Sequence, residues 1–370
     1  MKRAGVGLLF LASAVALSWI ASSGPETIER VYSRRLYPVI AAFLSGASAR
    51  VPISLAEVLV AALAVGLVAR VVFALRAAPR CGWFRSVASL AADLLLLAGG
   101  LVFCFVFLWG LNYRRQPFAV IASLDARPAS VAELSALASG LATRANDLRQ
   151  GLPEDALGVL RAPGGAVGVL DRTGLGFEAA ARRYPALAGR CLRPKPVVLS
   201  EAMSWLGISG IYSPFTGEAN VNVKVPDPEL PFAAAHETAH QRGFAREDEA
   251  NFAGYLACRF HPDPVFQYAG LLAASVHASN ALHAVDRATA RNVEALRSAA
   301  VQRDLRALRE WAARYEGPAA RAAERVNDAY LKSQGAPDGV RSYGRMVDLL
   351  LAERRADAAG PREGAGSEPK

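Results

Sequence analysis

The sequence predicts a mainly helical protein with a small β element, in which membrane helices at the N-terminus are followed by an α+β domain. Three observations predict this class. The chain is 52% hydrophobic and 20% charged, and its apolar runs are concentrated in the first 111 of 370 residues. Helical periodicity fills most of the chain after residue 262. Residues 208–226 alternate apolar and polar positions and are rich in β-branched and aromatic side chains, as β-strands are.

Three apolar runs predict transmembrane helices at about residues 4–22, 54–75 and 87–109. Each run is long enough, or nearly so, to cross a hydrocarbon core of about 30 Å. The first run has an alternative interpretation as a cleaved signal peptide, because the small residues 21–24, Ala-Ser-Ser-Gly, follow it.

Basic residues orient these helices across a cytoplasmic membrane. Lys2 and Arg3 place the N-terminus in the cytoplasm. The loop between the second and third helices is also cytoplasmic, since it carries Arg76, Arg80 and Arg85. Residues 112–355 then form an extracytoplasmic domain, and the polar residues 356–370 form a disordered tail. The sequence therefore predicts a multi-pass protein of the inner membrane. Four arginines between the first two helices argue against this orientation: Arg30, Arg34, Arg35 and Arg50.

The net charge of +9 does not indicate a nucleic-acid partner. No nucleic-acid-binding module is present, and basic residues do not interleave with aromatic ones. The expected partner besides a substrate is the lipid bilayer, whose anionic headgroups attract arginine.

Within the domain, residues 112–127 read as a linker that leaves the membrane. Ser130 and Glu133 have the spacing of a capping box at the start of a helix. Residues 194–207 read as a short strand or turn before an ambiguous segment, and residues 208–226 as a hairpin. Further helices are expected at 130–150, 174–189, from about 232, and at 263–286, 292–317, 319–335 and 340–356.

Residues 236–240, His-Glu-Thr-Ala-His, match the motif HExxH. Residues four apart lie on one face of a helix, so the imidazoles of His236 and His240 can bind one zinc ion. Glu237 lies beside them, where it can accept a proton from a metal-bound water. The competing interpretation is a solvated surface helix that carries two histidines.

A catalytic zinc ion needs a third protein ligand. Gly243 is expected to end the motif helix in a left-handed turn, before a second helix with acidic residues in its first turn. Glu247 is the predicted third ligand, with Glu249 as the alternative, because the short loop leaves the register open. Asn251, one turn after Glu247, is predicted to hydrogen-bond and orient a histidine.

This pattern resembles the gluzincin metallopeptidases, in which a glutamate on the helix after HExxH completes the zinc site. Residues 210–222, 231–258 and 330–352 also resemble an uncharacterised family of bacterial membrane proteins, known as a domain of unknown function. The resemblance extends from the second membrane helix to about residue 352. It implies membrane helices before an extracytoplasmic, zincin-like α+β domain, and it implies no substrate.

The expected function is hydrolysis of peptide bonds by a membrane-anchored zinc metallopeptidase, acting on peptides or proteins at the outer face of the cytoplasmic membrane. Glu237 would take a proton from water and return it to the leaving amine. One alternative is a zinc amide hydrolase acting on cell-wall peptides. The other is a catalytically inactive, metal-stabilised binding or signalling module.

Other residues have weaker links to this chemistry. Residues 211–216 and 219–223 are candidate edge strands for an extended peptide. His277 is the further histidine expected nearest the site. Four tyrosines can donate to an oxyanion, although packing is the favoured role for each: Tyr212, Tyr255, Tyr330 and Tyr343.

Overall fold

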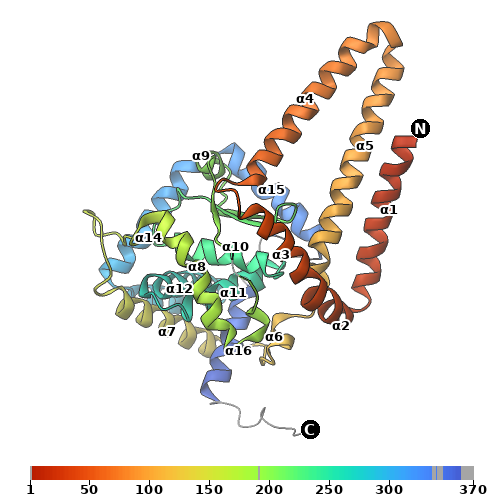
Figure 1. Cartoon of the computed structure of the whole chain (residues 1–370). Coiled ribbons are helices and arrows are strands. Elements are labelled where there is room, and N and C mark those ends of the chain that lie inside the picture. Colours follow the sequence, from red (N-terminus) through yellow and green to blue (C-terminus); the bar gives the residue numbers. More distant parts are fainter. Residues whose placement is uncertain (1, 191, 336–338, 340–344, 360–370) are drawn as a thin grey trace.

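A computed structural model describes residues 2–190, 192–335, 339 and 345–359 of the chain. Most of these residues are helical, and one three-stranded sheet is the β element (Figure 1). The predicted fold class, mainly α with a small β element, is therefore confirmed. Tyr343 and residues 360–370 of the predicted tail lie outside the described residues.

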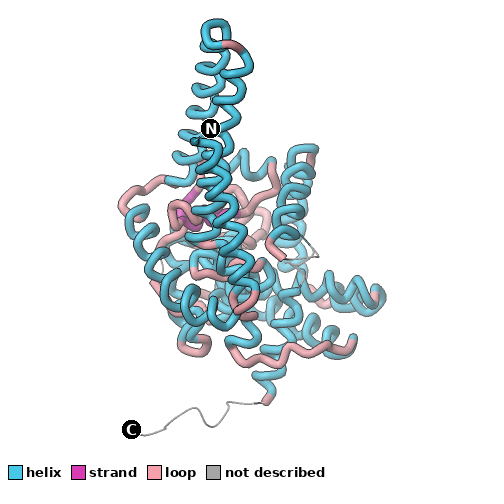
Figure 2. Tube along the Cα trace, turned by 90° about the vertical axis from the view of Figure 1, so that its right-hand side faces the viewer, coloured by secondary structure: helices cyan, strands magenta, loops and turns pink. Residues whose placement is uncertain are grey.

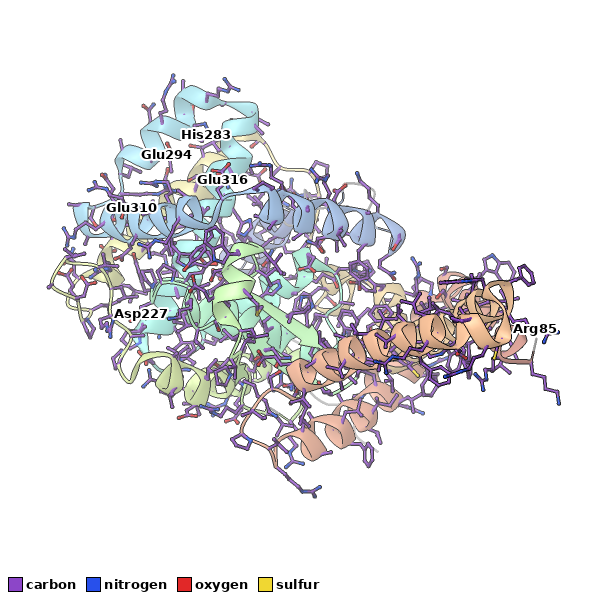
Figure 3. The ribbon with its side chains drawn as sticks, turned by 90° about the horizontal axis from the view of Figure 1, so that it is seen from above. Arg85, Asp227, His283, Glu294, Glu310 and Glu316 are labelled. Atoms are coloured by element: carbon purple, nitrogen blue, oxygen red, sulfur yellow. The ribbon has the colours of Figure 1, made fainter. Side chains whose placement is uncertain are left out.

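Three helices are long and apolar enough to cross a membrane: α1 (Lys2–Ser22), α4 (Leu55–Cys81) and α5 (Trp83–Leu108). They match the predicted segments to within a few residues, except that α4 continues to Cys81. Helices α4 and α5 form a hairpin that projects from the domain, and α1 packs along α5 (Figure 1). Arg85 lies near the far end of this hairpin (Figure 3). These helices indicate that the protein associates with a membrane.

Small residues and one carboxylate join the three apolar helices. A Cβ atom at Gly7 on α1 would lie 2.6 Å from the backbone of α5, and one at Gly99 on α5 would lie 2.3 Å from the Gly7 oxygen. The two helices therefore touch backbone to backbone, as small residues permit. Asp93 on α5 pairs with Arg3 on α1 at 2.8 Å and with Arg70 on α4 at 2.7 Å. One carboxylate thus contacts a side chain of both neighbouring helices.

The segment between α1 and α4 is helical. It consists of α2 (Pro25–Thr27), the π-helix η1 (Ile28–Leu36) and α3 (Tyr37–Ser48). The sequence predicts an extracytoplasmic loop at this position, between the first two membrane helices, and not a helix. In the structure, α3 packs against the sheet, where a Cβ atom at Gly217 would lie 2.7 Å from the Ser45 nitrogen. Gly217 is also in the left-handed conformation, with φ of 66°. The close contact and the backbone conformation therefore both favour glycine at this turn.

The sheet has the strand order β1-β3-β2. Strand β1 (Lys195–Pro196) is parallel, and β2 (Gly210–Ser213) antiparallel, to the central β3 (Glu218–Val221). Strands β2 and β3 form the predicted hairpin, and β2 is an edge strand. The sheet lies at the base of the α4–α5 hairpin (Figure 2).

Glu218 joins the sheet to the start of α4. Its buried carboxylate accepts hydrogen bonds from the Leu55 N–H at 3.1 Å and from the Ala56 N–H at 2.8 Å. These N–H groups begin α4, and a helix N-terminus favours negative charge. The same carboxylate pairs with the buried Lys195 of β1. The sheet therefore fixes the point at which α4 leaves the domain.

The remaining helices build the domain around α10 and α11, and their bounds are as follows: η2 (Gly110–Arg114), α6 (Phe118–Ile121), α7 (Val131–Arg149), α8 (Gly165–Ala181), η3 (Pro185–Leu187), α9 (Ser200–Trp205), α10 (Leu230–Gln241), α11 (Glu247–Arg259), α12 (Pro264–Val285), α13 (Arg287–Ala295), α14 (Ala299–Tyr315), α15 (Pro318–Ser333) and α16 (Met346–Ala358). Helix α7 begins with the predicted capping box of Ser130 and Glu133. The segment predicted as a linker is packed rather than open, since Asn112 and Phe118 are fully buried.

Two clusters of buried apolar residues stabilise this arrangement. The larger one fills the space between α7, α8, α10, α11, α12 and α16. The smaller one, the aromatic cluster, lies where the apolar helices meet the domain, and its aromatic members are Tyr32, Tyr37, Trp109, Tyr113 and Tyr212. It joins the ends of α1 and α5 to η1, α3 and β2.

Candidate metal centre

Helix α10 carries the motif. It begins at Leu230, two residues before the predicted start, with Pro231 in its first turn, where the missing N–H has no helical partner to lose. All of its residues except His236 are buried. A solvated surface helix, the competing interpretation from the sequence, does not fit a helix packed on nearly every side.

The turn after α10 brings the second helix back over the motif. Gly243 has φ of 83° and ends the helix in the predicted left-handed turn. Helix α11 then packs on α10 with Gly254 against His236. A Cβ atom at Gly254 would lie 3.1 Å from the His236 nitrogen, so a larger residue would push the two helices apart. The glycine therefore sets the spacing between the histidines and the first turn of α11.

Three predicted ligand side chains converge across this contact. The Nε2 atoms of His236 and His240 are 3.1 Å apart. The Oε2 atom of Glu247 lies 3.3 Å from the first of these nitrogens and 3.5 Å from the second. One donor atom from each residue lies within 4.8 Å of the others, as donors around a single ion do.

Glu249, the alternative third ligand, faces away from the histidines. Its buried carboxylate accepts the Phe118 N–H at 2.7 Å and pairs with Arg246 at 2.6 Å. Of the two candidates, only Glu247 is therefore brought to the histidines.

The local hydrogen bonds fit a zinc ion in this position. His240 Nδ1 lies 2.8 Å from the Phe244 carbonyl oxygen, which can only accept a hydrogen bond. A proton on Nδ1 leaves the Nε2 lone pair of the neutral ring directed at the cluster. The buried Oε2 atom of Glu247 faces the two histidine nitrogens and has no other hydrogen-bond donor among the described residues. Two imidazoles and a carboxylate are also a donor set that zinc accepts.

Glu237 lies between this cluster and the edge strand β2. It is buried, and the backbone N–H of Tyr212 donates a hydrogen bond to its carboxylate. Gly210 makes room for it, since a Cβ atom there would lie 2.4 Å from Glu237 Cγ. The Oε2 atom of Glu237 has no donor in the described part of the chain and remains able to accept a proton. The strand thus positions the residue predicted to be the general base.

Burial and neighbouring charges shift the pKa values of these groups. Burial raises the pKa of Glu237 above its ordinary value, against the influence of both histidines. Burial opposes the imidazolium form of His240, but the Glu247 and Glu237 carboxylates outweigh it and raise the pKa of His240 to about 9. The histidines hold the pKa of Glu247 well below its ordinary value, although burial acts the other way. Without metal, Glu247 and His240 therefore form a buried ion pair.

The aromatic cluster supports the carbonyl end of α10. Trp109 Nε1 donates to the His240 oxygen at 3.1 Å, and the Tyr37 hydroxyl donates to the Gln241 oxygen at 2.8 Å. The His240 carbonyl also accepts the Gly243 N–H at 2.9 Å. For the Gln241 carbonyl, Tyr37 supplies a donor that the end of the helix does not. Sequence reasoning missed both residues, and no local pattern indicates them, because 131 and 204 positions separate the partners.

The other predicted residues differ in their relation to the cluster. Asn251 is buried, but no hydrogen bond to either histidine is found within the described residues, so its predicted role is not seen here. His277 lies close enough for the charge of His236 to add to burial in lowering the pKa of His277 to about 4. Among the three candidate tyrosines that the structure describes, only Tyr330 has a hydroxyl pKa that the charge of Glu247 helps burial to raise.

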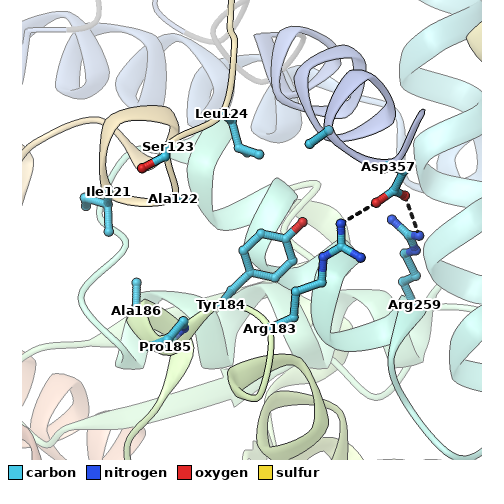
Figure 4. Close-up of a pocket in the computed structure, with 11 residues that line it drawn as sticks. Ile121, Ala122, Ser123, Leu124, Arg183, Tyr184, Pro185, Ala186, Arg259 and Asp357 are labelled. Carbon is cyan, nitrogen blue, oxygen red and sulfur yellow. Dashed lines mark hydrogen bonds and ion pairs between the residues drawn. The ribbon is translucent and has the colours of Figure 1, made fainter. Parts of the chain in front are cut away.

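Two cavities in the domain differ in their distance from the histidines. One, of about 340 Å³, borders Glu247 and is also lined by Tyr113, Arg246 and by Ser22 and Pro25 at the end of α1. The other, of about 690 Å³, lies away from the histidines between α6, η3 and α16. There, Asp357 bridges Arg183 and Arg259, so both guanidinium groups at its edge are already paired (Figure 4). Of these two cavities, the smaller one therefore borders a predicted metal ligand.

Fold and site together define a class of protein: a helical domain joined to apolar helices that associate with a membrane, with two histidines and a glutamate gathered as metal ligands would be. The chain belongs to the DUF3810 family of proteins of unknown function, whose family model matches residues 32–351. No curated protein and no solved structure matches the chain.

Proposed function

We propose that this protein is a zinc-dependent metallopeptidase that cleaves peptides or proteins at the outer face of the cytoplasmic membrane. One observation carries the proposal: the donor atoms of His236, His240 and Glu247 lie within 4.8 Å of one another, with the Glu237 carboxylate beside them.

The chemistry follows from the positions of these groups. A zinc ion held by the three donors would polarise a peptide carbonyl and lower the pKa of a coordinated water to about 7. Glu237 accepts the proton of the attacking water on its unpaired oxygen and delivers it to the leaving amine. The raised pKa of Glu237 suits both transfers, because the group must hold the proton between them.

Three donors favour a catalytic role over a structural one. Structural zinc sites are usually closed by four protein ligands, whereas catalytic sites keep one position open. In the described part of the chain, no fourth His, Cys, Asp or Glu joins the cluster. The edge strand β2 lies beside Glu237 and offers backbone groups to an extended peptide.

The topology of the apolar helices supports an outside location. The N-terminus and the tip of the α4–α5 hairpin both point away from the domain (Figure 1). Both carry the basic residues that mark cytoplasmic ends: Lys2, Arg3, Arg76, Arg80 and Arg85. The domain then lies on the opposite side of the membrane.

The test uses the full-length protein in detergent, because Trp109 and Tyr37, at the junction with the apolar helices, support α10. Bound zinc per chain is measured in the wild type and in His236→Ala, Glu247→Gln and Glu237→Gln, with Glu249→Gln as the matched control. About one zinc is expected in the wild type, Glu237→Gln and Glu249→Gln, and a loss in the other two. Cleavage of a mixed-sequence peptide library is expected of the wild type and Glu249→Gln, and not of Glu237→Gln.

The remaining outcomes separate the alternatives. Zinc without cleavage of any peptide favours the metal-stabilised binding module. Cleavage of peptidoglycan fragments but not of ordinary peptides favours the cell-wall amide hydrolase. A wild type that binds no zinc, even after zinc is added back, contradicts the proposal.

A further inference from the structure

We propose that an exposed apolar surface around the base of α4 docks onto the lipid bilayer. Two segments that are far apart in the sequence form this surface, which we call the collar. Its members are Leu36, Val39 and Phe43 on one segment and Val198, Leu199 and Trp205 on the other.

The first segment is placed by its connections. Helix α3 and η1 join the end of α1 to the start of α4, and both of those ends lie on the domain side of the apolar helices (Figure 1). If α1 and α4 cross a bilayer, a helix between these two points runs along the bilayer surface. Leu36, Val39 and Phe43 are spaced three and four residues apart, so they share one helix face, and Val39 and Phe43 are 66% and 76% exposed. Tyr37 and Ser45 on the other side of the helix are buried against the domain.

The second segment is tied to α4 itself. Glu57, in the first turn of α4, accepts hydrogen bonds from the Val198 N–H at 2.9 Å and the Leu199 N–H at 2.8 Å. Val198 and Leu199 are 77% and 62% exposed although they lie beside a helix that is apolar enough to enter the membrane. Trp205 follows at the end of α9 and is also exposed, and tryptophan is enriched at membrane interfaces.

A lipid surface is the occupant that this position favours. Exposed apolar patches on protein surfaces are commonly interaction sites, and this one continues directly into two apolar helices. Exposed basic residues border it, including Arg35 and Arg50 at either end of α3. Apolar side chains flanked by arginine are typical of helices that lie in the headgroup region. Arg35 and Arg50, two of the four arginines that argue against the orientation predicted from the sequence, thereby gain a role at the bilayer surface.

The collar limits which substrates reach the site, an inference that rests on the proposed function. The cavity that reaches Glu247 is lined by Ser22 and Pro25, where α1 leaves the membrane. The edge strand β2 follows α9 in the chain and exposes Ile211. With the collar in the bilayer, both lie close to the membrane surface. The preferred substrate is then a polypeptide segment that emerges from the bilayer, which is cleaved faster than a freely diffusing peptide.

The docking is tested by fluorescence in the full-length protein, reconstituted in nanodiscs of ordinary lipid or of lipid brominated on its acyl chains. Phe43→Trp and Leu199→Trp each add a reporter to one half of the collar. Leu157→Trp is the matched control, because Leu157 is 79% exposed in the loop between α7 and α8, away from the apolar helices. Trp205→Phe removes the native tryptophan of the collar.

Brominated lipid is expected to quench most of the emission added at positions 43 and 199, and little of that added at 157. Trp205→Phe is expected to show less quenching than the wild type. If either collar position behaves like position 157, the collar does not dock as proposed. This measurement needs no enzymatic activity.

The substrate class is tested separately with a mixed-sequence peptide library, either soluble or joined by a short spacer to a transmembrane segment in the same nanodisc. Cleavage of the tethered library is expected to be faster by at least about tenfold, as tethering raises local concentration. Equal rates for both libraries overturn the restriction on substrate. No cleavage of either library contradicts the proposed function and leaves the fluorescence result to decide the docking.

Discussion

Zinc binding to this protein is expected to release one proton from His240. The imidazole has a pKa of about 9 in the metal-free protein, so it carries a proton at neutral pH that a metal ion must displace. Apparent zinc affinity should therefore rise about tenfold per pH unit between about pH 7 and pH 8.5, or about 1.4 kcal/mol per unit.

Zinc competition with a chelator of known pKa measures this slope, and calorimetry in two buffers of different ionisation enthalpy counts the proton. Glu247→Gln should lower the affinity and flatten the slope, because the Glu247 charge is the main cause that raises the pKa of His240. Glu249→Gln should keep the slope, since that carboxylate pairs with Arg246 instead. A wild-type affinity that does not change over this pH range would refute the ion pair.

The same shift has a consequence for the metal-free fold. A raised histidine pKa contributes stability that is complete below the ordinary value of 6.5 and is lost as the pH rises through about 9. The free energy of unfolding without metal should therefore fall between these values, and chemical denaturation at several pH values measures it. If the free energy of unfolding of Glu247→Gln falls by the same amount over this pH range, the fall comes from groups other than this ion pair.

Three further substitutions probe the site and its attachment. Gly210→Ala should keep zinc but slow hydrolysis about a hundredfold, because the new Cβ atom displaces the Glu237 carboxylate, and a normal rate would exclude this position for the base. Glu249→Gln should keep zinc and lower stability by roughly 2 kcal/mol in denaturation, through weakened hydrogen bonds to a buried charge. Glu218→Ala should destabilise the protein by about 3–5 kcal/mol, because it leaves the buried Lys195 ammonium without its counter-charge. Replacing both residues of that pair by apolar ones should restore most of the loss, and a double variant as unstable as the single one would contradict the argument.

The sequence predicted those features that depend on neighbours along the chain. Apolar run length located the three candidate membrane helices, and a spacing of four placed His236 and His240 on one face. Gly243 ended the helix as predicted, because a left-handed turn favours glycine wherever it occurs. The acidic residues in the first turn of α11 were the predicted source of the third ligand, although the choice between Glu247 and Glu249 depended on a rotation that only the packed helices fix.

Features that depend on distant contacts were not predictable. Tyr37 and Trp109 contact α10 because α3 and the end of α5 meet there, and neither has a periodic signal. Helix α3 was not predicted, because it is short and packs against a sheet that is distant in the sequence. The burial of Asn112 and Phe118 was not predicted either, because it also comes from contacts with distant parts of the chain.

Trp109 connects the end of α5 to the candidate metal centre. It follows the last residue of α5, and its indole N–H binds the carbonyl oxygen of the second histidine of the motif. A change in the tilt of α5 therefore moves a group that is bonded to the peptide unit of His240. A membrane helix that is longer than the local bilayer is thick can tilt to fit it. With α5 in a bilayer, a change in bilayer thickness would therefore act on the candidate metal centre through Trp109, by this hydrogen bond and by its ring contact with His240.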